Sequence, residues 1–353
     1  MNSPHPQLGL LPSLSHLLHR YFIGFLLGSY ILAGFFPRFG EWLRSISLGH
    51  VSGLGEMTSL SVTVVLLGIL LLNASLSLEK IQDLIRSPQL LLAGLVANVG
   101  LPVVVLYFAS LIMSFTSAPE HVQSIIVALA LLSTVPVAGA ATAYTQNSDG
   151  DVPLAVGLVL ISIFLSPWLM PISLNFINWA AVGDYTAALS QLKGGAPTLV
   201  LLLSVLLPSI LGLALRPLLG AQRVESAKPT LKLINSICLL LLNYTNASLA
   251  LPQAFASPEW GFLASAFTFV VLLCSIDFMA GWWLAKLLRA KTGQCLALMF
   301  GVGMNNNGTA LVLASLAFAN QPKILIPMIL YSLVQNLIAS ASATLIATSS
   351  ASL

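Results

Sequence analysis

Apolar stretches as long as a membrane-spanning helix follow one another along almost the whole chain of 353 residues. A transmembrane helix needs about 20 consecutive apolar residues. Charged residues make up 7% of the chain, against about 25% in soluble globular proteins. No segment between the apolar stretches is long enough to form a soluble domain. We therefore expect an integral membrane protein of the all-α polytopic class, with one membrane domain over residues 1–353.

The stretches, bounded by charged residues or by Pro and Gly, predict ten transmembrane helices. They lie at residues 22–36, 57–76, 89–115, 122–145, 152–178, 196–219, 230–251, 260–288, 293–318 and 323–347. Loops on one side of the membrane then hold ten Lys and Arg residues, and loops on the other side hold four. Because Lys and Arg gather on the cytoplasmic side, we expect both termini to be cytoplasmic and the protein to lie in the inner or plasma membrane.

The chain repeats itself at a long period. NASLSL at 73–78 returns as NASLAL at 246–251, and SPQ at 87–89 returns as SPE at 257–259, at offsets of 173 and 170 residues. The matches predict two five-helix repeats, approximately residues 20–180 and 195–348. An odd number of spans inverts the second repeat in the membrane, an arrangement that recurs in secondary transporters.

The ninth stretch, GVGMNNNGTALVLA at 301–314, places three asparagines between glycines. Glycine costs about 1 kcal/mol against alanine in a helix, and Asn competes with the backbone for hydrogen bonds. We expect this helix to break, with Asn307 capping a second half-helix that begins at Gly308. The N-terminus of that half-helix would attract an anion. The alternative is that the amides only cross-link neighbouring helices.

The repeat predicts a corresponding break in the fourth stretch, STVPVAGAATAYTQ at 133–146. Pro136 lacks a backbone donor and Gly139 weakens the next turn, so a helix should break there. A proline kink without functional meaning is the alternative.

Asp277 is the only acid clearly inside a predicted span. Carboxylates within a membrane are functional candidates by default, and Asp277 is a candidate proton site. The alternative is a structural residue that is protonated or paired.

On these residues the chain resembles the bile acid:sodium symporter family. G-V-G-M-N-N-N-G at 301–308 is similar to the family's E-V-G-M-Q-N-S-G, and Pro136 with GDVPL at 150–154 is similar to its fourth-span proline and G-N-V-A-L turn. Ala97, Asn98 and Pro102 resemble a third-span A-Q-x-x-x-x-P, and Gln335 with Asn336 resembles a tenth-span H-N pair. The resemblance implies that the fourth and ninth helices are broken and cross between a panel domain and a core domain.

The resemblance also implies a small organic anion, a carboxylate or bile-acid-like molecule, bound near that crossing. The implied substrate-binding positions are Gly139, Thr142, Asn306, Asn307, Gln335 and Asn336. No Arg or Lys occupies these positions, so anion recognition would rest on helix ends and amides.

The family's two sodium sites are where the sequence departs from it. The acid shared by both sites is Gly301 here, and the other positions of the first site are Ala141, Thr142, Ala155 and Val159. A hard cation needs several oxygen ligands and negative charge, so we expect the first site to be absent. The second site would keep the backbone carbonyls of Val302 and Met304 and the amides of Asn98 and Asn305, as a weakened sodium site.

We therefore predict a secondary transporter of a small organic anion by alternating access, with doubtful sodium coupling and with a proton on Asp277 or simple exchange in its place. The alternatives are a sodium-coupled symporter that uses only the second sodium site, and a membrane sensor that does not transport. No zinc HExxH pair, acid-rich prenyl-type motif or second membrane aspartate suggests an enzyme. We expect a monomer in the bilayer that binds no nucleic acid and no cofactor, with sodium as the one candidate ion.

Overall fold

The computed structural model describes residues 18, 21–53, 56–76, 87–113, 119–177, 199, 202–318 and 321–350. The predicted basic residues Arg20, Lys80, Arg86 and Lys193 lie outside these ranges. The elements are almost all helices: α2 (Phe22–Phe35), α3 (Arg38–Ser45), β1 (Ser47–Gly53), β2 (Glu56–Ser61), α4 (Val62–Leu76), α5 (Pro88–Met113), α6 (Pro119–Thr134), α7 (Ala140–Asn147), α8 (Val152–Ile177), a π-helical turn (Leu202–Leu206), α11 (Leu207–Leu219), α12 (Ala221–Ala247), α13 (Leu251–Ala256), α14 (Trp260–Leu287), α15 (Thr292–Gly303), α16 (Asn307–Ala317), a 3₁₀ turn (Pro322–Ile324) and α17 (Leu325–Ser350).

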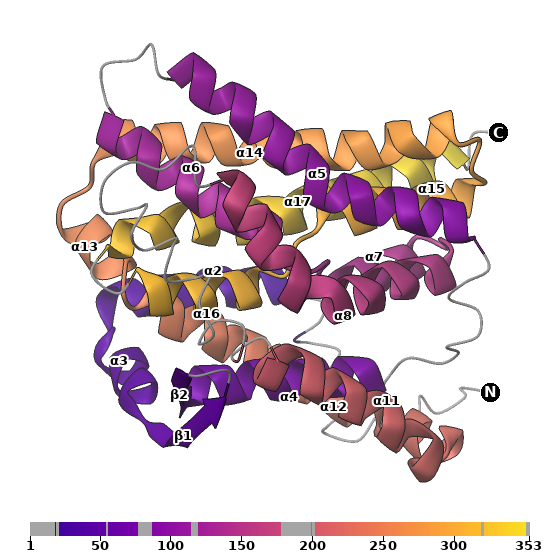
Figure 1. Ribbon diagram of the computed structural model, residues 1–353, viewed down its shortest axis with the longest axis horizontal. Helices are drawn as coiled ribbons and strands as arrows, with labels where there is room; N and C mark the ends of the chain where they lie inside the picture. The colour runs from indigo at the N-terminus through magenta and orange to yellow at the C-terminus, as the bar shows by residue number, and fades with distance from the viewer. Residues whose placement is uncertain are drawn as a thin grey trace, which may run out of the picture.

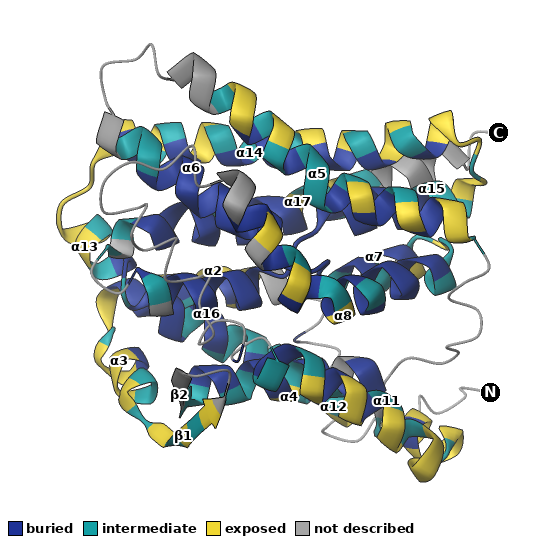
Figure 2. Ribbon diagram, viewed as in Figure 1, coloured by how far each residue is buried: buried dark blue, intermediate teal, exposed yellow. Residues whose placement is uncertain are grey.

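Five helical stretches of the described chain are long and apolar enough to cross a membrane: Pro88–Ala109, Val152–Met170, Leu202–Leu219, Trp260–Leu287 and Leu325–Ser342. Shorter apolar helices cover Gly24–Phe35, Val62–Asn73, His121–Thr134 and Thr292–Gly303. Large apolar side chains such as Leu92 and Trp283 are exposed on outer faces, and Figure 2 shows these faces on α5 and α14. A surface this apolar is suited to lipid, and the chain is an integral membrane protein.

The helices form two groups (Figure 1). In the first group, α4 packs against α11 and α12, and α2 packs against α12 and α13. In the second group, α14 packs against α15, α17 and α5, while α8 packs against α5, α6, α7 and α15. The groups meet where α12 and α4 contact α16 and where α12 and α2 contact α17. The second group contains both broken helices.

Two short antiparallel strands correct the all-α prediction. β1 pairs with β2, with His50 opposite Ser59 and Val51 opposite Thr58. The predicted span 57–76 therefore begins as a strand, and helix α4 starts only at Val62. Both strand sequences, SLGHVSG and EMTSLS, are rich in Ser and mix polar with β-branched residues. Such a segment suits a hairpin at the end of the molecule better than a helix in hydrocarbon.

The predicted span 230–251 is displaced as well. Helix α12 starts at Ala221, directly after Gly220, whose φ of 80° permits the sharp reversal from α11. Its first turns carry exposed polar side chains such as Arg223 and Glu225. The helix thus extends beyond its apolar part, and apolar length alone underestimates it.

Candidate functional site

The fourth and ninth predicted helices are both interrupted, and their interruptions cross each other. Helix α6 ends at Thr134 and α7 begins at Ala140, while α15 ends at Gly303 and α16 begins at Asn307. Val137 and Asn305 pair as an antiparallel bridge. The amide of Ala138 donates to the Met304 carbonyl, and the amide of Asn306 donates to the Pro136 carbonyl, both at 2.9 Å. The two breaks thus satisfy each other's backbone, as non-helical backbone buried in a membrane protein must be satisfied.

Two polar side chains complete this crossing. Gln335 of α17 accepts from the Asn305 backbone amide (3.2 Å), and its own amide donates to the Asn305 carbonyl (3.3 Å). The Val137 amide donates to the Ser162 hydroxyl of α8 at 3.0 Å. Gln335 therefore lies at the crossing, as predicted, and its amide is engaged by the backbone of the break.

Asn306, and not Asn307, caps α16. The Asn306 side-chain oxygen accepts from the Thr309 amide at 3.2 Å. The predicted cap at Asn307 is wrong by one residue, because the pairing with Pro136 holds Asn306 outside the helix and lets Asn307 take the first helical position. Local sequence does not distinguish adjacent asparagines.

Asn307 and Thr309 carry buried polar atoms that have no protein partner. Asn307 is 6% exposed, and neither its amide nitrogen nor its side-chain oxygen has a hydrogen-bond partner in the described chain. The fully buried Thr309 hydroxyl has none either. Buried polar groups are satisfied in the great majority of cases, so two unsatisfied side chains at one helix start need an explanation. A polar ligand is one.

The amide nitrogen of Asn98 is surrounded by oxygen atoms of the ninth helix. It lies 3.0 Å from Asn305 Oδ1, 3.3 Å from the Val302 carbonyl oxygen and 3.4 Å from the Gly301 carbonyl oxygen. The Asn98 side-chain oxygen has no partner in the described chain. We call these four oxygens, including Asn98 Oδ1, the oxygen cluster. Met304 is not part of it, because its carbonyl accepts from Ala138.

The oxygen cluster fits a small cation only in part. Oxygen atoms are the ligands that hard cations such as sodium prefer, but all four are neutral and no carboxylate belongs to the cluster. The fit also requires the Asn98 amide to turn and present its oxygen.

Hydrocarbon fills the place of the other predicted sodium site. A Cβ atom on Gly301 would lie 2.4 Å from Leu158 Cδ1, and one on Gly94 would lie 2.8 Å from Leu158 Cδ2. Leu158 is fully buried and belongs to an apolar cluster with Ala155 and Leu298. Gly301 therefore lacks both the charge and the space for an acid.

Asp277 is joined to the crossing through Tyr331, which the sequence analysis missed. The Tyr331 hydroxyl donates to Asp277 Oδ2 and accepts from Asn305 Nδ2, both at 3.3 Å. Asp277 and Tyr331 are fully buried, and Asp277 Oδ1 has no partner in the described chain. Tyr331 precedes Gln335 by four residues, a spacing that places both on one face of a helix. That spacing could have identified it.

The remaining predicted substrate positions lie around α7. Gly139 precedes α7 and opens on empty space, since nothing lies within 4 Å of a Cβ built there. The Thr142 hydroxyl donates to the Gly139 carbonyl at 2.7 Å. Asn336 donates to the Ser332 carbonyl (2.7 Å) and also lies near Tyr144, whose hydroxyl is 3.4 Å from Asn336 Oδ1. Asn336 thus faces α7, whereas Gln335 faces the break in the ninth helix.

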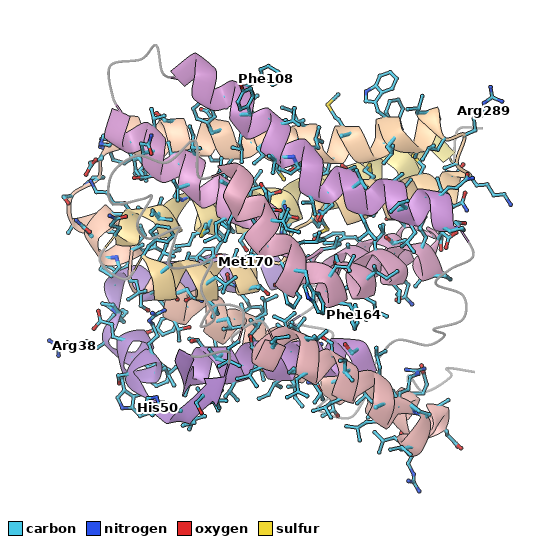
Figure 3. All side chains as sticks on the ribbon, viewed as in Figure 1. Arg38, His50, Phe108, Phe164, Met170 and Arg289 are labelled. Atoms are coloured by element: carbon cyan, nitrogen blue, oxygen red, sulfur yellow. The ribbon has the colours of Figure 1, made fainter. Side chains whose placement is uncertain are left out.

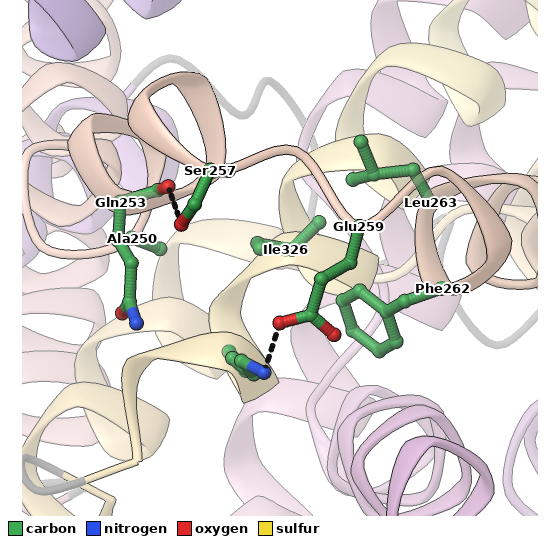
Figure 4. Close-up of a pocket in the computed structure, with 9 residues that line it drawn as sticks. Ala250, Gln253, Ser257, Glu259, Phe262, Leu263 and Ile326 are labelled. Atoms are coloured by element: carbon green, nitrogen blue, oxygen red, sulfur yellow. Dashed lines mark hydrogen bonds and ion pairs between the residues drawn. The ribbon is translucent and has the colours of Figure 1, made fainter. Parts of the chain in front are cut away.

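A separate surface pocket lies far from the crossing, at one end of α14 (Figure 4). Glu259 pairs there with Lys323 and with His121, whose Nε2 is 3.0 Å from Glu259 Oε2. The hydrogen bond from Lys323 lowers the pKa of the Glu259 carboxyl, and the charges of Lys323 and His121 lower it further. The pocket joins α13 to the starts of α14 and α17.

The model of the SBF-like CPA transporter family (DUF4137) matches residues 20–348, which is nearly the whole chain. The chain belongs to this family. The prediction of a bile acid:sodium symporter-like protein is confirmed at the level of the family. The family is a transporter family, in agreement with the absence of enzyme motifs noted in the sequence.

Two curated Bacillus subtilis (strain 168) proteins are similar to this SBF-like chain. "Uncharacterized protein YbaS" is 25% identical over 215 residues, which cover 61% of this chain and 66% of YbaS. "Uncharacterized sodium-dependent transporter YocS" is 25% identical over 311 residues, which cover 87% of this chain and 89% of YocS. The match to a protein described as a transporter covers both broken helices' length of chain, and a membrane transporter is the coarse function of this chain.

Proposed function

We propose that this chain is a secondary transporter that carries a small organic anion, a carboxylate or bile-acid-like molecule, by alternating access. The observation that supports it best is the start of α16, where Asn307 and Thr309 bury polar atoms without protein partners. The N-terminus of a helix carries a partial positive charge and free amide donors, which suit an anion. Substrate contacts would come from this helix start and from the other predicted positions: Gly139, Thr142, Asn306, Gln335 and Asn336.

The proposal includes two inverted five-helix repeats, residues 20–180 and 195–348, with the first helix group as panel and the second as core. Its support is the pairing of Val137 with Asn305, which lie 168 residues apart in the chain. This separation is close to the offsets of 170 and 173 residues between the repeated sequence motifs. In this arrangement both termini are cytoplasmic.

Transport would depend weakly on sodium or not at all. Leu158 occupies the space that an acid at Gly301 would need, and the oxygen cluster has no carboxylate. A proton on Asp277, or exchange of one anion for another, would then drive transport. Sodium-coupled symport through the oxygen cluster is the second candidate, because three oxygens already face the Asn98 amide and because YocS is described as sodium-dependent.

Uptake by purified protein in proteoliposomes tests the proposal. We expect uptake of at least one radiolabelled carboxylate or bile acid from a panel, and counterflow of that substrate without an ion gradient. Replacing sodium with potassium should change the initial rate less than twofold. The variant Asn307→Ala should lower uptake several-fold, whereas Gln253→Ala, in the distant surface pocket, should not.

Binding of a substrate without counterflow would instead indicate a sensor. Uptake that depends steeply on sodium, with two ions carried per substrate, would overturn the sodium-independent mechanism. No uptake and no binding of any organic anion would overturn the substrate class.

A further inference from the structure

A continuous chain of hydrogen bonds joins the oxygen cluster to the buried carboxyl of Asp277. Asn98 Nδ2 donates to Asn305 Oδ1 (3.0 Å), and Asn305 Nδ2 donates to the Tyr331 hydroxyl (3.3 Å). That hydroxyl donates to Asp277 Oδ2 (3.3 Å). Four helices contribute one residue each: α5, the break after α15, α17 and α14. We call this chain the relay.

Every donation in the relay points the same way, toward Asp277. Asp277 is therefore the final acceptor, as a carboxylate would be. At the other end the Asn98 side-chain oxygen has no partner in the described chain. Both asparagines can turn their amides and exchange oxygen for nitrogen, but a turn of Asn305 changes which atom it offers to Asn98 and which it offers to Tyr331.

We propose that a small monovalent cation in the oxygen cluster and a proton on Asp277 exclude each other, and that Tyr331 transmits the effect between them. The proposal rests on the proposed function only for the location of the ion position. It does not depend on the identity of the organic substrate.

The orientation of Asn305 explains the exclusion. A cation needs Asn305 Oδ1 in the oxygen cluster, which leaves Asn305 Nδ2 to donate to Tyr331 and Tyr331 to donate to a carboxylate. A neutral Asp277 can donate its own proton to the Tyr331 oxygen. Tyr331 then donates to Asn305 Oδ1, and Asn305 Nδ2 points into the cluster, where N–H donors repel a cation.

The exchange balances in atoms and charge. When the cation binds, the O–H bond of the Asp277 carboxylic acid breaks, the electron pair stays on the carboxylate and the proton leaves to water. One positive charge replaces another in a region of low dielectric. Coulomb attraction between the bound cation and the carboxylate favours the same outcome.

Few other ionisable groups lie near Asp277. The Cys274 thiol, one turn earlier on α14, and the Tyr331 phenol are its electrostatic neighbours. The helices packed against α14 are α5, α6, α15 and α17. Their described sequences hold no Lys or Arg, and their other ionisable residues are Tyr107, Glu120, His121 and Cys295. Within these helices no fixed cation neutralises Asp277, so a proton or a bound cation must do so.

Cation binding at several pH values tests the relay in the purified full-length protein. Lithium, sodium and potassium are titrated separately while binding is followed by calorimetry in buffers of different ionisation enthalpy. For the cation that binds, we expect about one proton released per cation. The apparent affinity should rise with pH by up to about tenfold per pH unit over the range in which Asp277 titrates.

Two variants and a matched control separate coupling from folding. Tyr331→Phe keeps the ring but removes the hydroxyl, and it should bind the cation with a much smaller pH dependence and proton release. Asp277→Asn should abolish both. Tyr107→Phe changes an exposed tyrosine on α5 and should behave like the unmodified protein.

A pH dependence that Tyr331→Phe leaves unchanged would overturn the relay, as would cation binding without proton release. No stabilisation or heat with any of the three cations at any pH would also overturn it. These outcomes leave anion uptake in proteoliposomes untouched, and loss of that uptake would refute the transporter proposal without affecting the linkage.

Discussion

At the scale of single residues, the crossing separates roles that adjacent identical side chains share in the sequence. Asn305 uses its backbone for the pairing with Gln335 and its side chain for the relay. Asn306 caps α16, and Asn307 remains without a protein partner. Three amides in a row therefore serve three different ends, because the chain turns between each pair of them.

Asn306 and Asn307 should respond differently to truncation. Asn306→Ala removes a helix cap and should lower the free energy of unfolding by about 0.5–2 kcal/mol, whereas Asn306→Ser should restore most of it. Asn307→Ala removes a buried group that has no partner and should leave stability unchanged or raise it. Thermal unfolding in detergent measures both. If Asn307→Ala proves the more destabilising of the two, the cap is assigned to the wrong residue.

Gly301 should be intolerant of any side chain. Gly301→Ala places a methyl group 2.4 Å from Leu158 Cδ1 and should cost about 1–3 kcal/mol through overpacking. Leu158→Ala in the same chain should recover part of that loss. Gly139→Ala is the matched control, because open space surrounds the position. Equal melting temperatures for Gly301→Ala and the unmodified protein would contradict the close packing.

At the scale of elements, periodicity and punctuation predict where helices occur and where two of them break. Pro136 and the glycines around the three asparagines are local causes, so both breaks are visible in the sequence. The hairpin at 47–61 and the full length of α12 are not, because amphipathic ends fall below the apolar signal. Leu158 and Tyr331 were missed as well, since their importance arises from contacts between distant helices.

The paired breaks should depend on Gln335. Gln335→Ala removes the partners of both the Asn305 amide and the Asn305 carbonyl, and an unsatisfied buried group costs about 1–3 kcal/mol. We expect a large drop in melting temperature. Gln253→Ala, an exposed glutamine of α13, should cause little change. A stable Gln335→Ala protein with unchanged backbone hydrogen exchange at the crossing would argue against this support.

The Glu259 contacts should stabilise the fold in a pH-dependent way. Lys323 and His121 lower the pKa of Glu259 in the folded protein. Their contribution is therefore present above the pKa of the unfolded chain and is lost as pH falls through the lower folded-state pKa. The effect should be small, because the groups are solvent-exposed. Melting temperature against pH should show it in the unmodified protein and in Glu41→Gln, but not in Glu259→Gln.

At the scale of the whole molecule, charge is distributed toward the ends of the helices. Arg38 and Arg289 lie at opposite ends of the long axis (Figure 3). Helix α14, with 28 residues, runs from the end that holds Glu259 to the end that holds Lys286. Such a distribution suits a slab of hydrocarbon between two aqueous sides.

Accessibility of engineered cysteines tests the orientation. In a background without Cys238, Cys274 and Cys295, we expect Lys291→Cys to react with a membrane-impermeant thiol reagent from the cytoplasmic side only. Arg38→Cys should react from the opposite side only. Reversed labelling would invert the assignment of the termini, and labelling of both from one side would contradict the span count.

The crossing of the two breaks is held by main-chain atoms of Pro136, Ala138, Met304 and Asn306. None of these hydrogen bonds depends on the identity of a side chain, except that Pro cannot donate. The frame of the site can therefore persist while natural selection replaces the residues that it presents. Loss of an acid at one position, or gain of an amide at another, alters the cargo without dismantling the machine that moves it.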